Sequence, residues 1–259
     1  MAPGTAETVS AKEKLIVALD VESADEAVRL YGELRHEAGM FKVGSQLFTA
    51  AGPPLVRELV AAGARVFLDL KFHDIPNTVA AAAREAVRLG VALFNVHAAG
   101  GSEMLRRAAA ATAEEAARLG AERPRLIAVT VLTSADASVL EETGVAAPSI
   151  EAHVARLARL ADAAGLDGVV ASPHDIAPVR SAVARPDFLL VTPGVRTASA
   201  AHDDQKRVMS PAQAALAGAD FIVMGRAILN APDPARAARE VVEEIAGCGQ
   251  QAASSKDLL

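Results

Sequence analysis

Residues 66–78 read VFLDLKFHDIPNT, an apolar run that ends in charged residues just before a proline. The run VFLDLK (66–71) is typical of a buried strand, and Pro76 suits the first turn of a helix. Similar apolar runs recur along the chain and alternate with longer segments of helical periodicity. The predicted strands are LIVALD (15–20), MFKVG (40–44), VFLDLK (66–71), LFNVH (93–97), RLIAVTVL (125–132), GVVA (168–171), FLLVT (188–192) and FIVMG (221–225).

Eight strands alternating with helices within 259 residues predict an α/β fold, the (β/α)8 TIM barrel, as a single domain. The competing architecture is a doubly wound open sheet, which usually has a glycine-rich turn after its first strand. Here the first strand continues into LDVESADEA, which has no glycine. The helical segments include 24–38, 75–90, 102–119, 148–164 and 232–246, and left-handed helix caps are expected at Gly39, Gly63, Gly90, Gly120 and Gly165.

The ends and the composition limit the class of protein. We expect a barrel over residues 13–247, a disordered or loosely packed N-terminal tail over 1–12, and a flexible C-terminal tail over 248–259. The start lacks the pattern of a secretory signal, and no apolar run reaches the roughly 18 residues of a membrane helix. The single cysteine, Cys248, and the net charge of −6 favour a cytoplasmic protein that binds neither membrane nor nucleic acid.

Charged residues gather at the predicted carboxyl ends of the first three strands, where barrel enzymes carry their chemistry. Because side chains alternate along a strand, Asp69 and Lys71 share one face. Asp20 and Lys42 occupy comparable places on the first two strands, and Asp74 follows in a loop. Buried ion pairs stabilise weakly, so the cluster favours a reaction centre over a purely structural salt-bridge network.

Metal binding is an alternative use of the same carboxylates, since Asp20, Asp69 and Asp74 could hold Mg²⁺ through oxygen. The interleaved Lys42 and Lys71 would neutralise them and repel a cation. The histidines have no metal-ligand spacing, so we expect no metal. His97 could line the pocket or be a hydrogen-bonded structural residue.

The segment FIVMGRAIL (221–229) predicts a phosphate site after the last strand, where barrels often bind phosphate at a helix N-terminus. Backbone N–H groups near Gly225 and the guanidinium of Arg226 can grip an anion, and TPGVR (192–196) adds Arg196. Alternatively, Gly225 only permits the turn and Arg226 is a surface arginine. No P-loop, dinucleotide fingerprint or esterase elbow is present, so the pattern favours a small phosphorylated substrate.

DLKFHDIPNT (69–78) fits the D-x-K-x-x-D-I-P-x-T signature of the orotidine 5′-phosphate decarboxylase family. The segments VTVLTS, VTPGVR, DDQKRVMSP and FIVMGRAI resemble other segments of that family in the same order. The chain is therefore similar to this family over residues 14–246. Lys42 separates it from Mg²⁺-dependent 3-keto-gulonate 6-phosphate relatives, which carry an acid at this place.

The resemblance implies decarboxylation of orotidine 5′-monophosphate (OMP) to uridine 5′-monophosphate (UMP) without a cofactor, as the last step of de novo pyrimidine biosynthesis. Lys71 would protonate the C6 carbanion, and Asp69 would face the departing carboxylate. Lys42 and Asp74 would complete the charged array, with Asp74 and Thr78 reaching the partner's site in a homodimer.

The resemblance also implies how the substrate is bound. Residues 134–146 would form a mobile lid. The implied contacts are Asp20 and Lys42 to the ribose hydroxyls, Thr133 and Ser134 to the pyrimidine, Gln205 to base and phosphate, and Arg196, Gly225 and Arg226 to the phosphate. Two rivals remain: a metal-dependent decarboxylase or epimerase on the same barrel, and a non-catalytic barrel that only binds a phosphorylated ligand.

Overall fold

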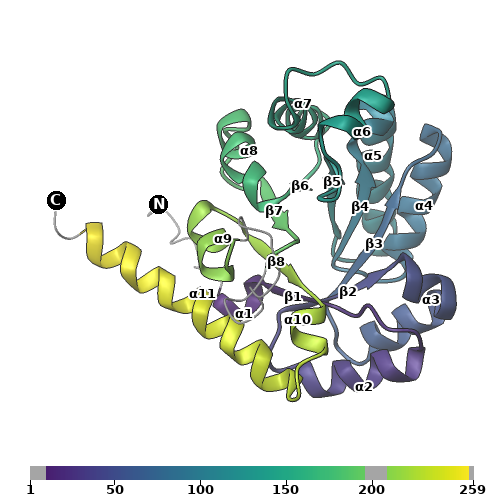
Figure 1. Ribbon diagram of the computed structural model, residues 1–259. Coiled ribbons are helices and arrows are strands. Elements are labelled where there is room, and N and C mark those ends of the chain that lie inside the picture. Colours follow the sequence, from purple (N-terminus) through teal and green to yellow (C-terminus); the bar gives the residue numbers. More distant parts are fainter. Residues whose placement is uncertain (1–9, 196–208, 257–259) are drawn as a thin grey trace, which may run out of the picture.

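The structure, a computed structural model, describes residues 10–195 and 209–256. Eight parallel strands close into a barrel in which each strand pairs with its neighbours in chain order, and β8 pairs with β1 (Figure 1). The predicted (β/α)8 barrel is confirmed. The strands are β1 (Leu15–Ala18), β2 (Met40–Gly44), β3 (Val66–Phe72), β4 (Leu93–His97), β5 (Arg125–Val129), β6 (Gly168–Val170), β7 (Leu189–Thr192) and β8 (Phe221–Met224).

Helices surround the barrel and connect successive strands (Figure 1). Both α4 and α9 begin at a proline, as expected from a residue whose missing N–H costs little in a first turn. The helices are α1 (Ala11–Lys14), α2 (Ala24–Leu34), α3 (Ser45–Ala61), α4 (Pro76–Arg88), α5 (Gly101–Leu119), α6 (Ala137–Glu142), α7 (Ile150–Ala163), α8 (Ile176–Ala182), α9 (Pro211–Ala217), α10 (Arg226–Leu229) and α11 (Pro234–Lys256), with 3₁₀ turns η1 (Ala98–Gly100) and η2 (Pro173–Asp175).

Two apolar layers result from the alternation of side chains along the strands. The larger layer lies between strands and helices and includes Leu68 and Phe94. The smaller layer fills the barrel and consists of Ile16, Ala18, Met40, Phe67, Leu93, Ile127, Val191 and Val223. On β2, β3 and β4, and just after β1, a polar residue stands two positions after a residue of the inner layer. These pairs are Ala18 and Asp20, Met40 and Lys42, Phe67 and Asp69, and Leu93 and Asn95. The inner layer is thus the floor beneath the polar residues.

The fifth strand is shorter than predicted and ends at Val129 rather than at residue 132. Its partner β6 has only three residues and ends at Val170, whose carbonyl accepts the N–H of Thr130. Without a partner strand the ladder stops, so Thr133 lies in the segment before α6.

Among the described residues, helices extend into both ranges that were predicted to be tails. Ser10 and Glu13 form a reciprocal capping box that starts α1 inside the predicted tail of residues 1–12. Helix α11 continues to Lys256, beyond residue 247, where the flexible tail was expected to begin. Alanine and glutamine favour helix, which explains the continuation. The mobility of the tails stays a prediction.

The expected left-handed caps occur at Gly63, Gly90, Gly120 and Gly165, which all have positive φ. The expectation for Gly39 is wrong, because its φ is not in the left-handed region. Gly39 is needed for space instead: a Cβ at this position would lie 2.5 Å from the Cα of Glu13. The chain entering β2 can therefore pass close to α1.

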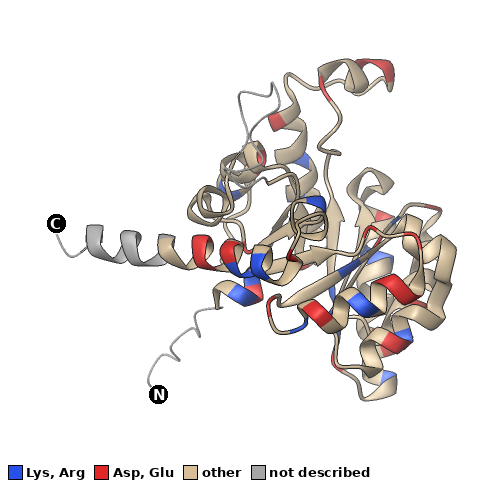
Figure 2. Cartoon of the chain, turned by 60° about the horizontal axis from the view of Figure 1, so that its bottom comes forward, with Lys and Arg blue, Asp and Glu red and all other residues tan. Residues whose placement is uncertain are grey.

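Acidic and basic residues occur together on the outer helices (Figure 2). Between α4 and α5, the buried carboxylate of Glu115 accepts hydrogen bonds from Arg88 at 2.7 Å and from Arg118 at 2.7 and 2.9 Å.

Within the described residues, no helix is both long enough and apolar enough to cross a membrane.

Candidate active site

Asp69 is the centre of the charged cluster and is only 9% exposed. Its Oδ1 accepts hydrogen bonds from Lys71 Nζ at 2.6 Å and Asn95 Nδ2 at 2.7 Å, while its Oδ2 lies 3.3 Å from Lys42 Nζ. Burial alone would raise the pKa of Asp69. The charge of Lys42, the hydrogen bond and charge of Lys71, and the Asn95 hydrogen bond outweigh burial and lower this pKa. Asp69 is therefore a carboxylate at neutral pH.

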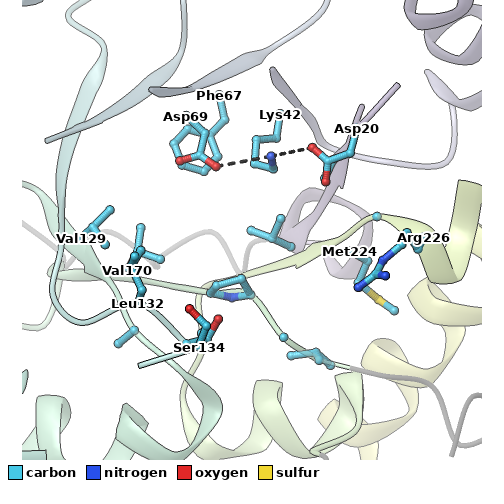
Figure 3. Close-up of a pocket in the computed structure, with 18 of the residues that line it drawn as sticks. Asp20, Lys42, Phe67, Asp69, Val129, Leu132, Ser134, Val170, Met224 and Arg226 are labelled. Carbon is cyan, nitrogen blue, oxygen red and sulfur yellow. Dashed lines mark hydrogen bonds and ion pairs between the residues drawn. The ribbon is translucent and has the colours of Figure 1, made fainter. Parts of the chain in front are cut away.

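Lys42 links Asp69 to Asp20, since its Nζ also donates to Asp20 Oδ1 at 3.0 Å (Figure 3). Asp20 is half exposed at the mouth, whereas Lys42 is buried. The structure thus joins Asp20, just after β1, to residues of β2 and β3 in one alternating row of acids and bases, as the sequence predicted. Over residues 10–195 and 209–256, no group of three His, Cys, Asp or Glu residues has the arrangement of a metal site.

The backbone at Lys71 departs from regular strand geometry. Its φ is 53°, and within the described part of the chain it is the sole non-glycine residue with positive φ. Pairing with β4 shifts at the same place: Leu68 pairs with Phe94, but Phe72 pairs with Val96. Strand β3 therefore bulges opposite Asn95. Such a conformation costs on the order of 1–3 kcal/mol and persists only where its surroundings enforce it.

Asn95 is a site residue to which sequence reasoning assigned no role. It is 1% exposed on β4. Its Oδ1 accepts the backbone N–H of Lys71 at 2.8 Å, and its Nδ2 donates to Asp69. The available signal was its position two residues after Leu93 of the inner layer, which turns a polar side chain into the barrel.

A pocket of about 960 Å³ opens above the inner layer. Its size suits a ligand as large as a nucleotide. In Figure 3, Asp69, Lys42 and Asp20 follow one wall, and Ser134 and Arg226 stand across the cavity from them. The lining residues proposed from the sequence are Asp20, Lys42, Asp69, Lys71, Thr133, Ser134, Gly225 and Arg226.

The wall at the end of β8, next to Asp20, has the features of an anion site. Gly225 ends β8 and precedes α10, and the exposed side chain of Arg226 follows it. A Cβ on Gly225 would lie 3.4 Å from Asp20 Oδ2, which is an ordinary contact distance, so Gly225 lies beside Asp20. Pro193 and Gly194 line the pocket on the β7 side. Arg196 and Gln205, also predicted to bind substrate, lie outside the described residues.

Asp74 and Thr78 do not line this pocket. Both are exposed, and Asp74 Oδ1 accepts the N–H of Ile75 at 2.6 Å. Ile75, between them, is 66% exposed, which is high for an isoleucine. Asp74, Ile75 and Thr78 are therefore exposed outside this pocket.

His97 lies at the end of β4 and does not line the pocket. Its ring centroid is 5.5 Å from that of His73. Burial, followed by the positive charges of His73 and Lys71, lowers the pKa of His97. His97 is therefore neutral at pH 7. Its predicted place in the pocket lining is wrong, and a hydrogen-bonded structural role stays a prediction.

The geometry agrees with the similarity of the chain to known proteins. A family model described as "Orotidine 5'-phosphate decarboxylase / HUMPS family" matches residues 13–241. The chain is 56% identical to the orotidine 5′-phosphate decarboxylase of Moorella thermoacetica, with 91% of this chain and 93% of that protein covered. It is 54% identical to the enzyme of the same name from Pelobacter propionicus, with 92% and 98% covered.

Solved structures agree as well. The crystal structure of orotidine 5′-phosphate decarboxylase from Lactobacillus acidophilus is similar with a TM-score of 0.79 and 35% identity, covering 89% of this chain and 98% of that one. An uncharacterized conserved protein from Geobacillus kaustophilus has a TM-score of 0.76 and 38% identity over 89% of this chain. The chain belongs to the orotidine 5′-phosphate decarboxylase / HUMPS family.

Proposed function

We propose that the protein decarboxylates OMP to UMP in the cytoplasm, as the last step of de novo pyrimidine biosynthesis, and uses neither a metal nor an organic cofactor. The observation that carries the proposal is the contact between Lys71 Nζ and Asp69, inside a pocket that Arg226 also lines. This arrangement offers a proton donor at one end of a ligand and a phosphate anchor at the other. Relatives that cover nearly the whole chain are named for this reaction.

The proposed binding mode follows the two walls. The 5′-phosphate lies against Gly225 and Arg226, with Arg196 as a further partner. Asp20 and Lys42 hold the ribose hydroxyls, and Thr133, Ser134 and Gln205 contact the pyrimidine side. The carboxylate on C6 then faces Asp69, and Lys71 lies beside C6.

At C6 of the substrate, one bond breaks and one forms, and an N–H bond of Lys71 breaks as the proton moves. The bond between C6 and the carboxylate carbon breaks, CO₂ leaves, and the electron pair remains on C6. The ammonium of Lys71 stabilises this charge and transfers a proton to C6, which completes UMP. Solvent reprotonates Lys71. Lysine suits the task because it is a cation at neutral pH and carries a transferable proton.

Repulsion between Asp69 and the substrate carboxylate supplies only part of the acceleration. Two unit charges about 4 Å apart interact by roughly 4 kcal/mol at an effective dielectric of 20, which is about three powers of ten in rate. Large enzymatic accelerations need on the order of 20 kcal/mol. Most of the effect must therefore come from stabilising the carbanion beside Lys71 and from phosphate binding energy expressed in the transition state.

The proposal includes a homodimer in which each subunit contributes to the other's site. Asp74 and Thr78 lie outside their own pocket, and the neighbouring Ile75 is exposed. An apolar side chain between two functional polar ones fits an interface better than free solvent. Asp74 would then extend the charged row of the partner subunit.

The test is to follow loss of the orotate absorbance of OMP with purified protein, with and without EDTA. Turnover that EDTA leaves unchanged is the expected result. A Lys71→Ala preparation made in the same host controls for contaminating host enzyme. Activity that EDTA abolishes would indicate a metal-dependent reaction. Binding of OMP without release of CO₂ would indicate a non-catalytic barrel that only binds a phosphorylated ligand.

A further inference from the structure

The geometry points to Asn95 as a positioning residue that holds Lys71 and Asp69 in their reactive arrangement. Asn95 does not line the pocket, so it acts on the substrate only through these two residues. The inference rests on the proposed function for its kinetic test, but not for its structural one.

The two hydrogen bonds of Asn95 determine its amide orientation. The Nδ2 group donates to Asp69 Oδ1 at 2.7 Å, and Oδ1 accepts the N–H of Lys71 at 2.8 Å. With the amide turned over, an oxygen would face the carboxylate of Asp69 and an NH₂ group would face the N–H of Lys71. Both contacts would become repulsive, so a single orientation serves both partners.

The bond to Lys71 supports an unfavourable backbone conformation. The ladder between β3 and β4 is interrupted between Leu68 and Phe72, and Lys71 has a φ of 53°. A buried N–H without a partner is costly, so the acceptor from Asn95 stabilises this bulge. The bulge determines the direction in which the Lys71 side chain leaves the strand, and its Nζ reaches Asp69 at 2.6 Å.

The bond to Asp69 supports the charge on the other partner. Asp69 is buried, and a buried carboxylate needs donors for its lone pairs. Lys71 gives up a proton during the proposed reaction, whereas the neutral amide of Asn95 keeps its protons and continues to donate to Asp69. Asn95 therefore keeps Asp69 ionised and aligned at the moment when Lys71 is neutral.

The kinetic test compares Asn95→Ala and Asn95→Asp with the wild type. Asn95→Ala removes both bonds, and we expect kcat for OMP to fall by about 10²-fold with little change in KM, since misplacing a reactive group by about 1 Å has that effect. A KM that rises with an unchanged kcat would overturn the inference.

Asn95→Asp keeps the acceptor for Lys71 but places a second carboxylate against Asp69. Two carboxylates sharing a site cannot both ionise easily, so we expect the acid limb of the kcat profile to move up by about one pH unit or more. The charged or titratable groups around Asp69 are Lys42 from β2, Lys71 from β3 and His97 from β4, with Asp20, just after β1, reached through Lys42. An unmoved acid limb would contradict the assignment.

Thr130→Val is the matched control. Thr130 is also buried at this end of the barrel, does not line the pocket, and loses one hydrogen bond, from its hydroxyl to the carbonyl of Val170 at 2.9 Å. It should lower the melting temperature without changing kcat or the pH profile. If Thr130→Val and Asn95→Ala have the same kinetic effect, Asn95 has only a general structural role.

A crystal structure of Asn95→Ala separates this inference from the proposed function. We expect Lys71 to leave the positive φ region or its Nζ to lose contact with Asp69. An unchanged bulge and contact would overturn the positioning role even if the wild type decarboxylates OMP. Wild-type protein that releases no CO₂ would overturn the proposed function, and the crystal structure would still decide the role of Asn95.

Discussion

Lys71 and Asp69 belong to the same strand, two residues apart, and their side chains form a 2.6 Å hydrogen bond within the pocket. Neighbours on one face of a regular strand point the same way without converging. Convergence here accompanies the bulge at Lys71. In the proposed reaction, the carboxylate of Asp69 would face the leaving group and the cation of Lys71 would stabilise the developing negative charge.

Lys71→Ala should lower kcat by more than about 10³-fold, because it removes both the charge that stabilises the carbanion and the proton donor. Binding of UMP, measured by calorimetry, should persist. Lys71→Arg is the matched comparison: it restores the charge but holds its proton at neutral pH. Substantial turnover by either variant would remove Lys71 from the proton-transfer step.

Arg226→Ala should reduce kcat/KM for OMP by about two to four powers of ten, as expected for the loss of a bidentate, charge-assisted contact to phosphate. The unphosphorylated nucleoside orotidine should be affected little. Arg236→Ala is the control, since Arg236 is an exposed arginine on α11 that pairs with Glu240 at 2.8 Å. Equal losses on nucleotide and nucleoside would place Arg226 away from the phosphate.

Shared sites can be tested by mixing two inactive variants, Lys71→Ala and Asp74→Ala. If Asp74 serves the partner's site, hybrid dimers contain one complete site and one doubly deficient site. After random reassortment the mixture should recover roughly a quarter of wild-type activity. No recovery, with reassortment verified by native mass spectrometry, would show that Asp74 acts in its own subunit.

Glu115 should make stability depend on acidic pH. Hydrogen bonds from Arg118 and Arg88 lower the pKa of Glu115 from 4.5 to about 2. Because the folded-state pKa is depressed, the stabilisation is complete above about pH 4.5 and is lost as pH falls towards 2.

The measurement is the urea midpoint of Glu115→Gln and wild type as a function of pH. The difference between them should be constant above pH 5 and shrink steadily below it. Glu114→Gln is the control, because Glu114 is exposed on the same helix and its ion pair with Arg84 is long, at 3.6 Å. Its difference from wild type should depend little on pH. A difference between Glu115→Gln and wild type that persists unchanged to pH 2 would contradict the assignment.

Much of the fold could be predicted because barrel strands have a local signature. Strands buried on both faces read as continuous apolar runs, so even the three-residue β6 was recognisable in GVVA. Element ends were less predictable. Strand β5 ends where its pairing with β6 ends. Gly39 leaves space for the close approach of α1 and does not cap a helix. Both depend on segments distant in the chain.

The sequence by itself determined the barrel, the row of Asp20, Lys42, Asp69 and Lys71, and the glycine-arginine pair after the last strand, because strand alternation and strand order are local properties. Tertiary structure decided the contact between Lys71 Nζ and the Asp69 carboxylate, and which residue positions these two side chains. The bulge accompanies the register shift between β3 and β4. Asn95, 24 residues after Lys71 in the chain, accepts the backbone N–H of Lys71 there. The residue pattern of one strand does not encode a hydrogen bond between two strands.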